Sequence, residues 1–317
     1  MTMKNGRYYL IIVVLITANI SAAQDTVTRS YFSLGSSTAG IGFGKAKKYN
    51  GLRFNINDAR AINEINGINI SVVNTDGDYP KGMINGLAIN LLGNRLRTVN
   101  GISIGGIGND IHYSNGICLS SIVHTSIEHN GLAGSVAVDF EELNGIAISA
   151  LAFYDVLNGV SISILGHNYF SEREGLSSKG VVLSLIGNNA EQVDGVVIGS
   201  LNNIEHVKGM GLGVGMMRYL TADGITIGLY ISAMTPPPIS VNGGDVYAPQ
   251  RPVEYPSPSS ASATGLLIGG INLCAKVTGL QIGLFNDADE LHGVQVGVLN
   301  HAKNSSLPWL PFINVVL

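Results

Sequence analysis

The chain has 317 residues, of which 13% are charged, about half the usual share, and its formal net charge is −4. So small a charge, without any run of Lys or Arg, does not indicate nucleic acid as a partner, and we expect none. Glycine makes up 41 residues, about twice its usual share, which makes internal repeats the first pattern to look for.

The N-terminus, residues 1–23, has the pattern of a secretory signal peptide. Lys4 and Arg7 form a basic region, residues 8–18 an apolar region, and residues 21–23 (Ser-Ala-Ala) a cleavage site of small residues. The apolar region is far shorter than the roughly 20 residues that a membrane-spanning helix needs. We therefore predict an exported protein, located at the cell surface or in the outer membrane, whose mature chain begins near Gln24.

From residue 50 onward the chain repeats a segment of 14 or 15 residues that starts with glycine. Ten of the fourteen steps between leading glycines have that length, and a fixed period predicts repeats that each stack on their neighbours. We place an N-terminal cap or atypical first repeat in residues 24–49, repeats in 50–231 and 265–303, a proline-rich insertion in 232–264 and a C-terminal cap strand in 304–317. The leading glycines are Gly51, Gly67, Gly86, Gly101, Gly116, Gly131, Gly145, Gly159, Gly180, Gly195, Gly209, Gly224, Gly265, Gly279 and Gly293.

Each repeat has two halves, which we number from its leading glycine as position 0. Positions 1 and 3 are almost always Leu, Ile or Val, as in Ile102 and Ile104, and position 4 is small or Asn. This alternation is typical of a strand, and we predict that positions 1, 3 and 5 face inward and positions 2 and 4 outward. The second half is polar with single apolar residues and often closes with Asn-Gly, a strong turn signal. Across positions 1 to 6 of all repeats, Arg53 is the only charged residue.

Two all-β architectures fit this pattern. The first is a β-solenoid (β-roll) of about fifteen 14–15-residue coils, in which Asn residues at a fixed corner stack in ladders that satisfy each other's amides. The alternative is an antiparallel outer-membrane β-barrel with one strand per repeat, which would explain the signal peptide, the low charge and a terminal apolar strand. We favour the solenoid, because the uncharged stretches of about seven residues are shorter than the 9 to 11 of a membrane strand and the aromatics form no girdles.

The last repeats and the C-terminus carry a family resemblance. Residues 279–286 (Gly-Leu-Gln-Ile-Gly-Leu-Phe-Asn) recur as residues 293–300, and Pro311-Phe312-Ile313-Asn314 follows in the final strand. These segments resemble a family of bacterial surface-repeat proteins with Gly-x-Gln-Ile-Gly-Leu-x-Asn repeats. The resemblance implies export and surface exposure, and it implies no catalytic residues. The 14–15-residue period is also similar, in spacing alone, to that of trimeric adhesin heads.

Cysteine and histidine give no sign of a metal or redox site in the sequence. Cys118 and Cys274 lie too many coils apart in a stack to form a disulfide, and we interpret both as small buried hydrophobic residues. His112, His124 and His129 are close in sequence, but no Cys or carboxylate completes a ligand set at metal spacing. We interpret these histidines as solvent-facing and predict no metal and no cofactor.

Other motifs of enzymes and ion sites are incomplete. Residues 74–78 (Asn-Thr-Asp-Gly-Asp) are similar to half a calcium loop, but Asn85 stands where the twelfth-position Glu would be. The acid pairs Glu141/Glu142 and Glu172/Glu174 fit solvated return segments. The glycines of residues 209–215 follow the repeat pattern and precede no helix, unlike a phosphate-binding loop. We therefore predict that the chain is not an enzyme.

The sequence thus predicts an exported, non-enzymatic surface repeat protein that acts as a structural or binding (adhesin-like) module. Its partner is expected to be a protein or glycan at the cell surface or another copy, bound by a strand face of Ser, Ala, Gly and Gln; membrane association is compatible with the composition. The insertion offers Tyr247, Arg251 and Tyr255 as possible contact residues, since loops vary freely and aromatic rings bind with little ordering cost. An outer-membrane pore or channel is the alternative function.

Overall fold

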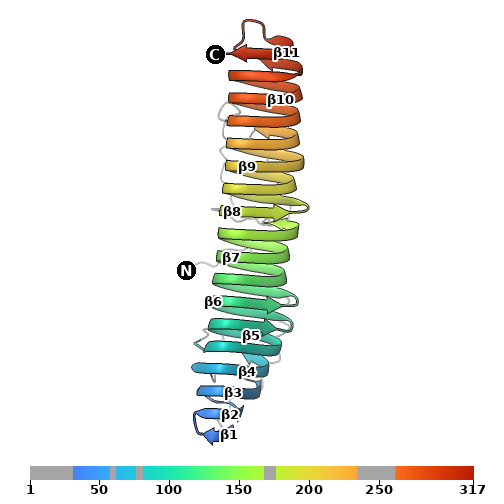
Figure 1. Cartoon of the computed structure of the whole chain (residues 1–317). Helices are drawn as coiled ribbons and strands as arrows, with labels where there is room; N and C mark the ends of the chain where they lie inside the picture. Colours follow the sequence, from blue (N-terminus) through green and yellow to red (C-terminus); the bar gives the residue numbers. More distant parts are fainter. Residues whose placement is uncertain (1–30, 58–61, 76–80, 168–175, 234–260) are drawn as a thin grey trace, which may run out of the picture. The chain divides into compact units, whose positions relative to one another are not determined.

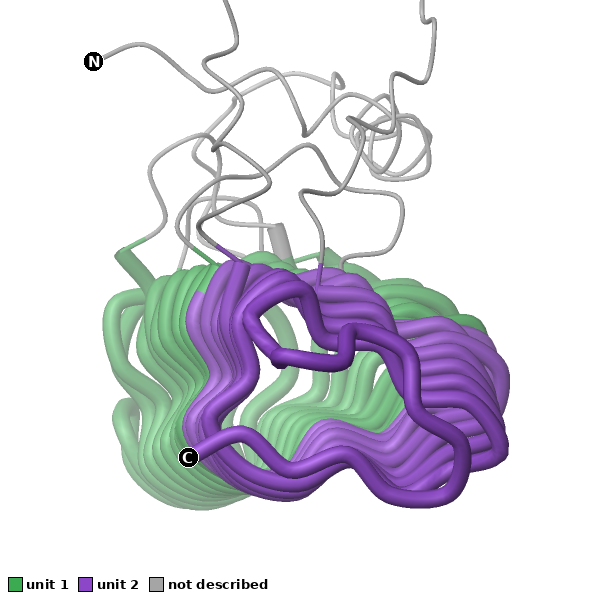
Figure 2. Tube along the Cα trace, turned by 90° about the horizontal axis from the view of Figure 1, so that it is seen from above, with its two compact units in different colours: residues 1–176 green, residues 177–317 purple. Residues whose placement is uncertain are grey.

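The computed structural model describes residues 31–57, 62–75, 81–167, 176–233 and 261–317. These residues form strands and turns and no helix, so the all-β prediction is confirmed. None of them forms a helix that could span a membrane. The described chain divides into two compact units, residues 1–176 and residues 177–317, which are coloured separately in Figure 2.

Within the described residues, the first unit has seven strands and the second unit four. Several of these strands are long because the pairing continues around the corners of the coil, so that one ribbon winds through more than one turn (Figure 1). The strands of the first unit are β1 (Tyr31–Ser36), β2 (Ala39–Gly44), β3 (Lys48–Asn57), β4 (Glu64–Thr75), β5 (Met83–Gly105), β6 (Gly108–Ser120) and β7 (Val123–His167). Those of the second unit are β8 (Ser177–Ser184), β9 (Gly187–Ala233), β10 (Ser262–Ala302) and β11 (Trp309–Val316).

Strand pairing in the first unit is parallel and in register from β2 onward. Leading glycines lie opposite each other, as in Gly51↔Gly67 between β3 and β4 and Gly101↔Gly116 between β5 and β6. Only the β1–β2 hairpin is antiparallel among the pairings described for this unit. Successive repeats are therefore coils that stack in register, with each residue above its counterpart in the coil before. This arrangement confirms the predicted β-solenoid. The alternative with one antiparallel strand per repeat is wrong.

The second unit follows the same rule. Gly180 pairs with Gly195 and Gly224 with Gly265 in parallel ladders, whereas β11 runs antiparallel to the last coil of β10. The strands β9 and β10 include Ser232 and Ala233 on one side and Ser262 to Thr264 on the other, so the outer residues of the predicted 232–264 insertion belong to the coils. The rest of that insertion lies outside the described residues.

The leading glycine is required by the geometry of the coil corner. All fifteen leading glycines have φ between 119° and 148°, a region that L-residues rarely adopt. A Cβ atom at Gly145 would in addition overlap the carbonyl oxygen of Gly131 in the coil before it. The period of the sequence therefore marks a corner of the coil that only glycine can occupy without strain.

The predicted facing of the first-half strand is wrong, because positions 2 and 4 point inward and positions 1 and 3 outward. Ser103, at position 2, is fully buried, whereas Ile102 and Ile104, at positions 1 and 3, are 40% and 39% exposed. The large core residues come instead from the second half, the return side of the coil, for example Ile111 and Phe140, both fully buried. Since the return side fills the narrow interior, only small or polar side chains fit inside the first-half strand.

Amide ladders satisfy the polar groups that this arrangement buries, as predicted for the solenoid. Along one inner corner of the second unit, Asn272 donates from Nδ2 to Asn286 Oδ1, and Asn286 donates to Asn300 Oδ1, at 2.7 Å each. In the first unit the Asn before each leading glycine forms a second ladder on the surface, with one step from Asn66 Nδ2 to Asn50 Oδ1 at 2.9 Å. Each ladder links coils by side-chain hydrogen bonds in addition to the backbone pairing.

Candidate functional site: an apolar strand face and a buried cysteine–histidine cluster

The outward side chains of positions 1, 3 and 5 form what we call the strand face. In the first unit the backbone register sets Ile102 beside Ile117 and Ile104 beside Leu119. None of these outward residues is charged, and Arg53, the one charged residue of the first-half strands, is buried and donates to Asn69 Oδ1 at 2.8 Å. Exposed members in the first unit include Ile68, Ile102, Ile104, Ile117, Leu119, Ile146, Ile148, Ile162 and Ile164.

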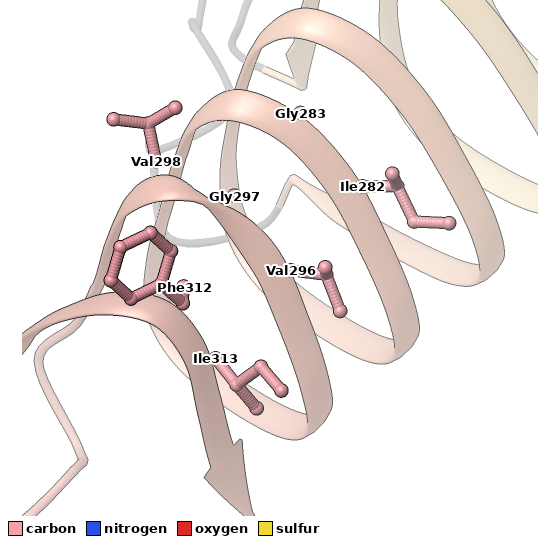
Figure 3. Close-up of a pocket in the computed structure, with 7 residues that line it drawn as sticks. All are labelled: Ile282, Gly283, Val296, Gly297, Val298, Phe312 and Ile313. Carbon is pink, nitrogen blue, oxygen red and sulfur yellow. The ribbon is translucent and has the colours of Figure 1, made fainter.

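The strand face of the second unit is also apolar. Leu229 and Leu284, both at position 5, are 68% and 66% exposed. Near the C-terminus, Ile282, Val296 and Ile313 lie in a row on successive coils and line a shallow apolar depression (Figure 3). The strand face therefore presents regularly spaced branched side chains in each unit.

Charged residues gather on the return side of the coils. There, Arg95 pairs with Asp110 at 3.2 Å in the first unit, and Lys276 pairs with Glu290 at 3.0 Å in the second unit. Such exposed pairs add little stability, but they leave the return side hydrated. Each coil is thus amphipathic on its exterior, with an uncharged strand face and a charged return side.

A second feature is a buried cluster of Cys118, His124 and His129 in the first unit. All three side chains lie in the interior of one coil, and their potential ligand atoms are within 4.8 Å of one another. Phe140 of the next coil packs against both imidazoles, with ring centroids 5.0 Å from His124 and 5.3 Å from His129. The cluster is therefore shielded from solvent.

The hydrogen bonds of the cluster are incomplete. His129 Nδ1 lies 2.6 Å from Ser114 Oγ, and the same hydroxyl hydrogen-bonds the Cys118 side chain. His129 Nε2 and both ring nitrogens of His124 have no hydrogen-bond partner among the described residues. Buried polar atoms are nearly always paired in proteins, so three unpaired nitrogens in one place need an explanation.

Burial keeps the cluster uncharged. It raises the pKa of the Cys118 thiol to about 12, against a smaller lowering effect of the Ser114 hydrogen bond. It lowers the pKa of His129 to about 4, and it lowers the pKa of His124 well below its ordinary value, with the neighbouring His129 acting in the same direction. At neutral pH the thiol and both imidazoles are therefore neutral.

Several sequence interpretations can be compared with these positions. Cys118 and Cys274 are free and buried, as predicted. The solvent-facing interpretation is wrong for His124 and His129, since both are fully buried, while half-buried His112 lies outside the cluster. The search for a Cys at metal spacing missed Cys118 because the ligands share an interior and not a sequence motif. Their positions 2, 8 and 13 in the coil are the signal that, with the correct facing, would have revealed them.

The structure describes some of the remaining candidates and not others. Glu142 accepts a hydrogen bond from Asn144 Nδ2 at 3.0 Å, as expected of a solvated return segment. Residues 209–215 lie within β9 and no helix follows them in the described chain, as predicted. Outside the described residues lie Asp76, Asp78, Glu172, Glu174, Tyr247, Arg251 and Tyr255.

A scan against protein-family models, a search of curated proteins and a search of solved structures returned no match to this chain. The resemblance to bacterial surface-repeat proteins therefore stays a prediction. The strand face and the buried cluster are therefore the two candidate functional features of the described chain.

Proposed function

We propose that this chain is an exported, non-enzymatic structural module of the cell surface that assembles by packing its strand face against the strand face of a second copy. The observation that carries the proposal is the exposure of Ile, Leu and Val at positions 1 and 3 of successive coils, with no charge among them. The signal-peptide pattern of residues 1–23 supports export.

The area of the strand face is large enough for such an interface. Strands lie about 4.8 Å apart and rise about 3.3 Å per residue, so a strip about five residues wide over about eight coils of the first unit covers roughly 600 Å². That is at the upper end of the largest apolar patch on a typical monomer, and it approaches the roughly 800 Å² that each partner contributes to a standard interface. Leaving this much apolar surface in water would be unfavourable.

A second copy fits the strand face better than the other expected partners. The residues expected to bind a glycan, such as Ser, Ala and Gln at position 2, point inward, as the burial of Ser103 and Gln281 illustrates. The strand face therefore offers few of the hydrogen-bonding groups that a sugar requires. A net charge of −4 gives no attraction to anionic lipid. Rows of branched side chains repeating at the strand spacing are complementary to themselves and can interdigitate as paired sheets do.

The alternative function, a pore, depended on one antiparallel strand per repeat. Because the described coils pair in parallel, that alternative has no support from the strand arrangement. An isologous interface between copies uses the same surface on both partners, so a single substitution changes both sides of the interface.

Sedimentation of the purified mature chain tests the proposal. Leu229→Lys/Leu284→Lys places two charges on the strand face at side chains that are already two-thirds exposed, so the fold of the monomer should be kept. Gln192→Lys/His206→Lys is the control, because it adds the same charge on exposed return-side positions. We expect the wild type and the control to form dimers or larger assemblies at micromolar concentration and the strand-face variant to dissociate at least about 100-fold more readily.

Two outcomes would overturn the proposal. One is a wild-type chain that stays monomeric at about 100 µM, well above the range of specific assembly. The other is a monomer that floats with phosphatidylcholine vesicles and loses this binding in Leu229→Lys/Leu284→Lys, which would assign the strand face to a bilayer.

A further inference from the structure

The cysteine–histidine cluster occupies a special place in the interior of the first unit. In the preceding coil, the positions in register with Cys118, His124 and His129 are held by Ser103, Asn109 and Ser114, in that order. These polar residues are hydrogen-bonded: Ser103 donates from Oγ to Asn109 Oδ1 at 3.1 Å, and Asn109 donates from Nδ2 to Leu119 O at 3.0 Å. One coil further, three hydrogen-bonding residues are replaced by three residues that are metal ligands in proteins.

On the other side of the cluster the interior becomes apolar. Cys118 is in register with buried Ala133, and Phe140 covers both imidazoles. From that side the backbone of Leu132 is the polar group recorded near His129, and no partner is recorded for either ring nitrogen of His124. From the register and the unpaired nitrogens, we propose that Cys118, His124 and His129 bind one Cu(I) ion inside the coil.

The orientation of His129 suits this role. In the tautomer that donates from Nδ1–H to Ser114 Oγ, at 2.6 Å, Nε2 carries the lone pair and is the nitrogen available to a metal ion. Metal-binding histidines usually donate their second N–H to such a neighbour, which fixes the ring. Ser114 also hydrogen-bonds Cys118, so one hydroxyl orients two of the three ligands.

The distances require only a modest contraction. The ligand atoms lie within 4.8 Å of one another, whereas three atoms at bond lengths of about 2.0 to 2.3 Å around one ion are about 3.6 Å apart. Cys118 and His124 belong to the same coil, and no hydrogen bond holds the His124 ring in place. Metal binding therefore requires the three side chains to shift by about 1 Å relative to one another within the packing of His129 and Phe140 around His124.

The charge and number of the ligands select the ion. When Cys118 binds, its S–H proton leaves to solvent as the metal–sulfur bond forms, and the metal keeps its oxidation state. One thiolate and two neutral imidazoles with Cu(I) make a neutral site, which a dry, apolar interior tolerates. Zn²⁺ would leave a net positive charge there and normally takes four ligands. No fourth Cys, His, Asp or Glu joins the group among the described residues, whereas a thiolate with two imidazoles suits copper.

The test variants place at Cys118 and His124 the side chains that the preceding coil already holds at the same positions. Cys118→Ser and His124→Asn recreate the side chains of Ser103 and Asn109, so each should fold. Cys274→Ser is the matched control, since Cys274 is the other buried free cysteine and belongs to no candidate metal group in the described chain. Each full chain is produced in copper-supplemented medium, purified without oxygen, and analysed for copper and zinc in the presence of the Cu(I) competitor bicinchoninate.

We expect about one copper per chain in the wild type and in Cys274→Ser, and at least a 100-fold loss of Cu(I) affinity in Cys118→Ser and His124→Asn, in line with the loss of one of three ligands. X-ray absorption at the copper edge of the wild type, which needs no variant, should show one sulfur and two nitrogen neighbours. Absence of copper from the wild type, retention of copper by Cys118→Ser, a copper spectrum without sulfur, or zinc held in place of copper would each overturn the proposal. None of these results bears on self-assembly through the strand face.

Discussion

The inverted facing of the first-half strand predicts that Ser103→Asp is far more damaging than Ile104→Asp. Ser103 is fully buried, accepts from Asn94 Nδ2 at 3.0 Å and donates to Asn109 Oδ1 at 3.1 Å. An aspartate cannot donate to Asn109, which costs about 1 kcal/mol, and an unpaired buried carboxylate costs about 3 to 5 kcal/mol. We therefore expect Ser103→Asp to lower the free energy of unfolding by about 4 to 6 kcal/mol.

The change at Ile104 removes a side chain that is 39% exposed. Since full burial of Ile contributes about 1.5 to 3 kcal/mol, the part that is buried contributes about 1 to 2 kcal/mol, and the lower strand propensity of Asp adds a few tenths more. Urea unfolding of dilute, non-associated protein, followed by far-ultraviolet circular dichroism, measures both changes. If Ile104→Asp destabilised the monomer as much as Ser103→Asp, the assignment of inner and outer positions would be refuted.

Three further predictions concern the corner, the ladders and the cluster. Gly145→Ala should destabilise the first unit by more than about 3 kcal/mol in urea unfolding, because φ is 148° and the new Cβ meets the neighbouring backbone; a mild effect would contradict the corner geometry. Asn286→Ala removes both 2.7 Å ladder bonds and should cost about 2 to 4 kcal/mol, against less than about 1.5 for Asn203→Ala, which makes one bond at 3.0 Å to Asn189. For the chelator-treated protein, the lowered pKa values of His124 and His129 place full stability above about pH 6.5. The free energy of unfolding of this metal-free protein should then fall by up to about 1.4 kcal/mol per pH unit for each His as the pH drops toward 4. His124→Asn/His129→Ser should remove this slope in denaturation curves measured at several pH values.

The repeat, the corner and the ladders were predictable from sequence because each is a local property. The leading glycines mark a corner where φ is positive in every described repeat, and Asn-Gly pairs point to the ladder that joins Asn66 to Asn50. Strand alternation was also visible, since positions 1 and 3 differ chemically from positions 2 and 4. These patterns fix the period and the class of fold without any knowledge of the interior.

The facing of the strand was not predictable from alternation alone. The rule that apolar positions face the core assumes that the strand supplies most of the core, whereas here residues of the return side, such as Leu96 and Phe140, fill it. A coil this narrow has room for one set of large side chains. The cluster was missed for a related reason: Cys118 was expected to be buried, but His124 and His129 on the return side were expected to face solvent, so the three side chains were not brought together.

The two sides of the coil contribute different residues to the interior, and this difference connects the strand face to the cluster. Because the return side supplies the large buried residues, position 2 inside the first-half strand is free to be Ser, Ala, Gln or Cys without loss of core volume. Ser103, Cys118 and Ala133, in successive coils, occupy this position. A substitution there changes the chemistry of the interior and leaves the apolar exterior of positions 1 and 3 unchanged. Interior chemistry and surface assembly can therefore vary independently along the same strand, which is why a single coil can acquire a ligand set while its outer face continues the pattern of its neighbours.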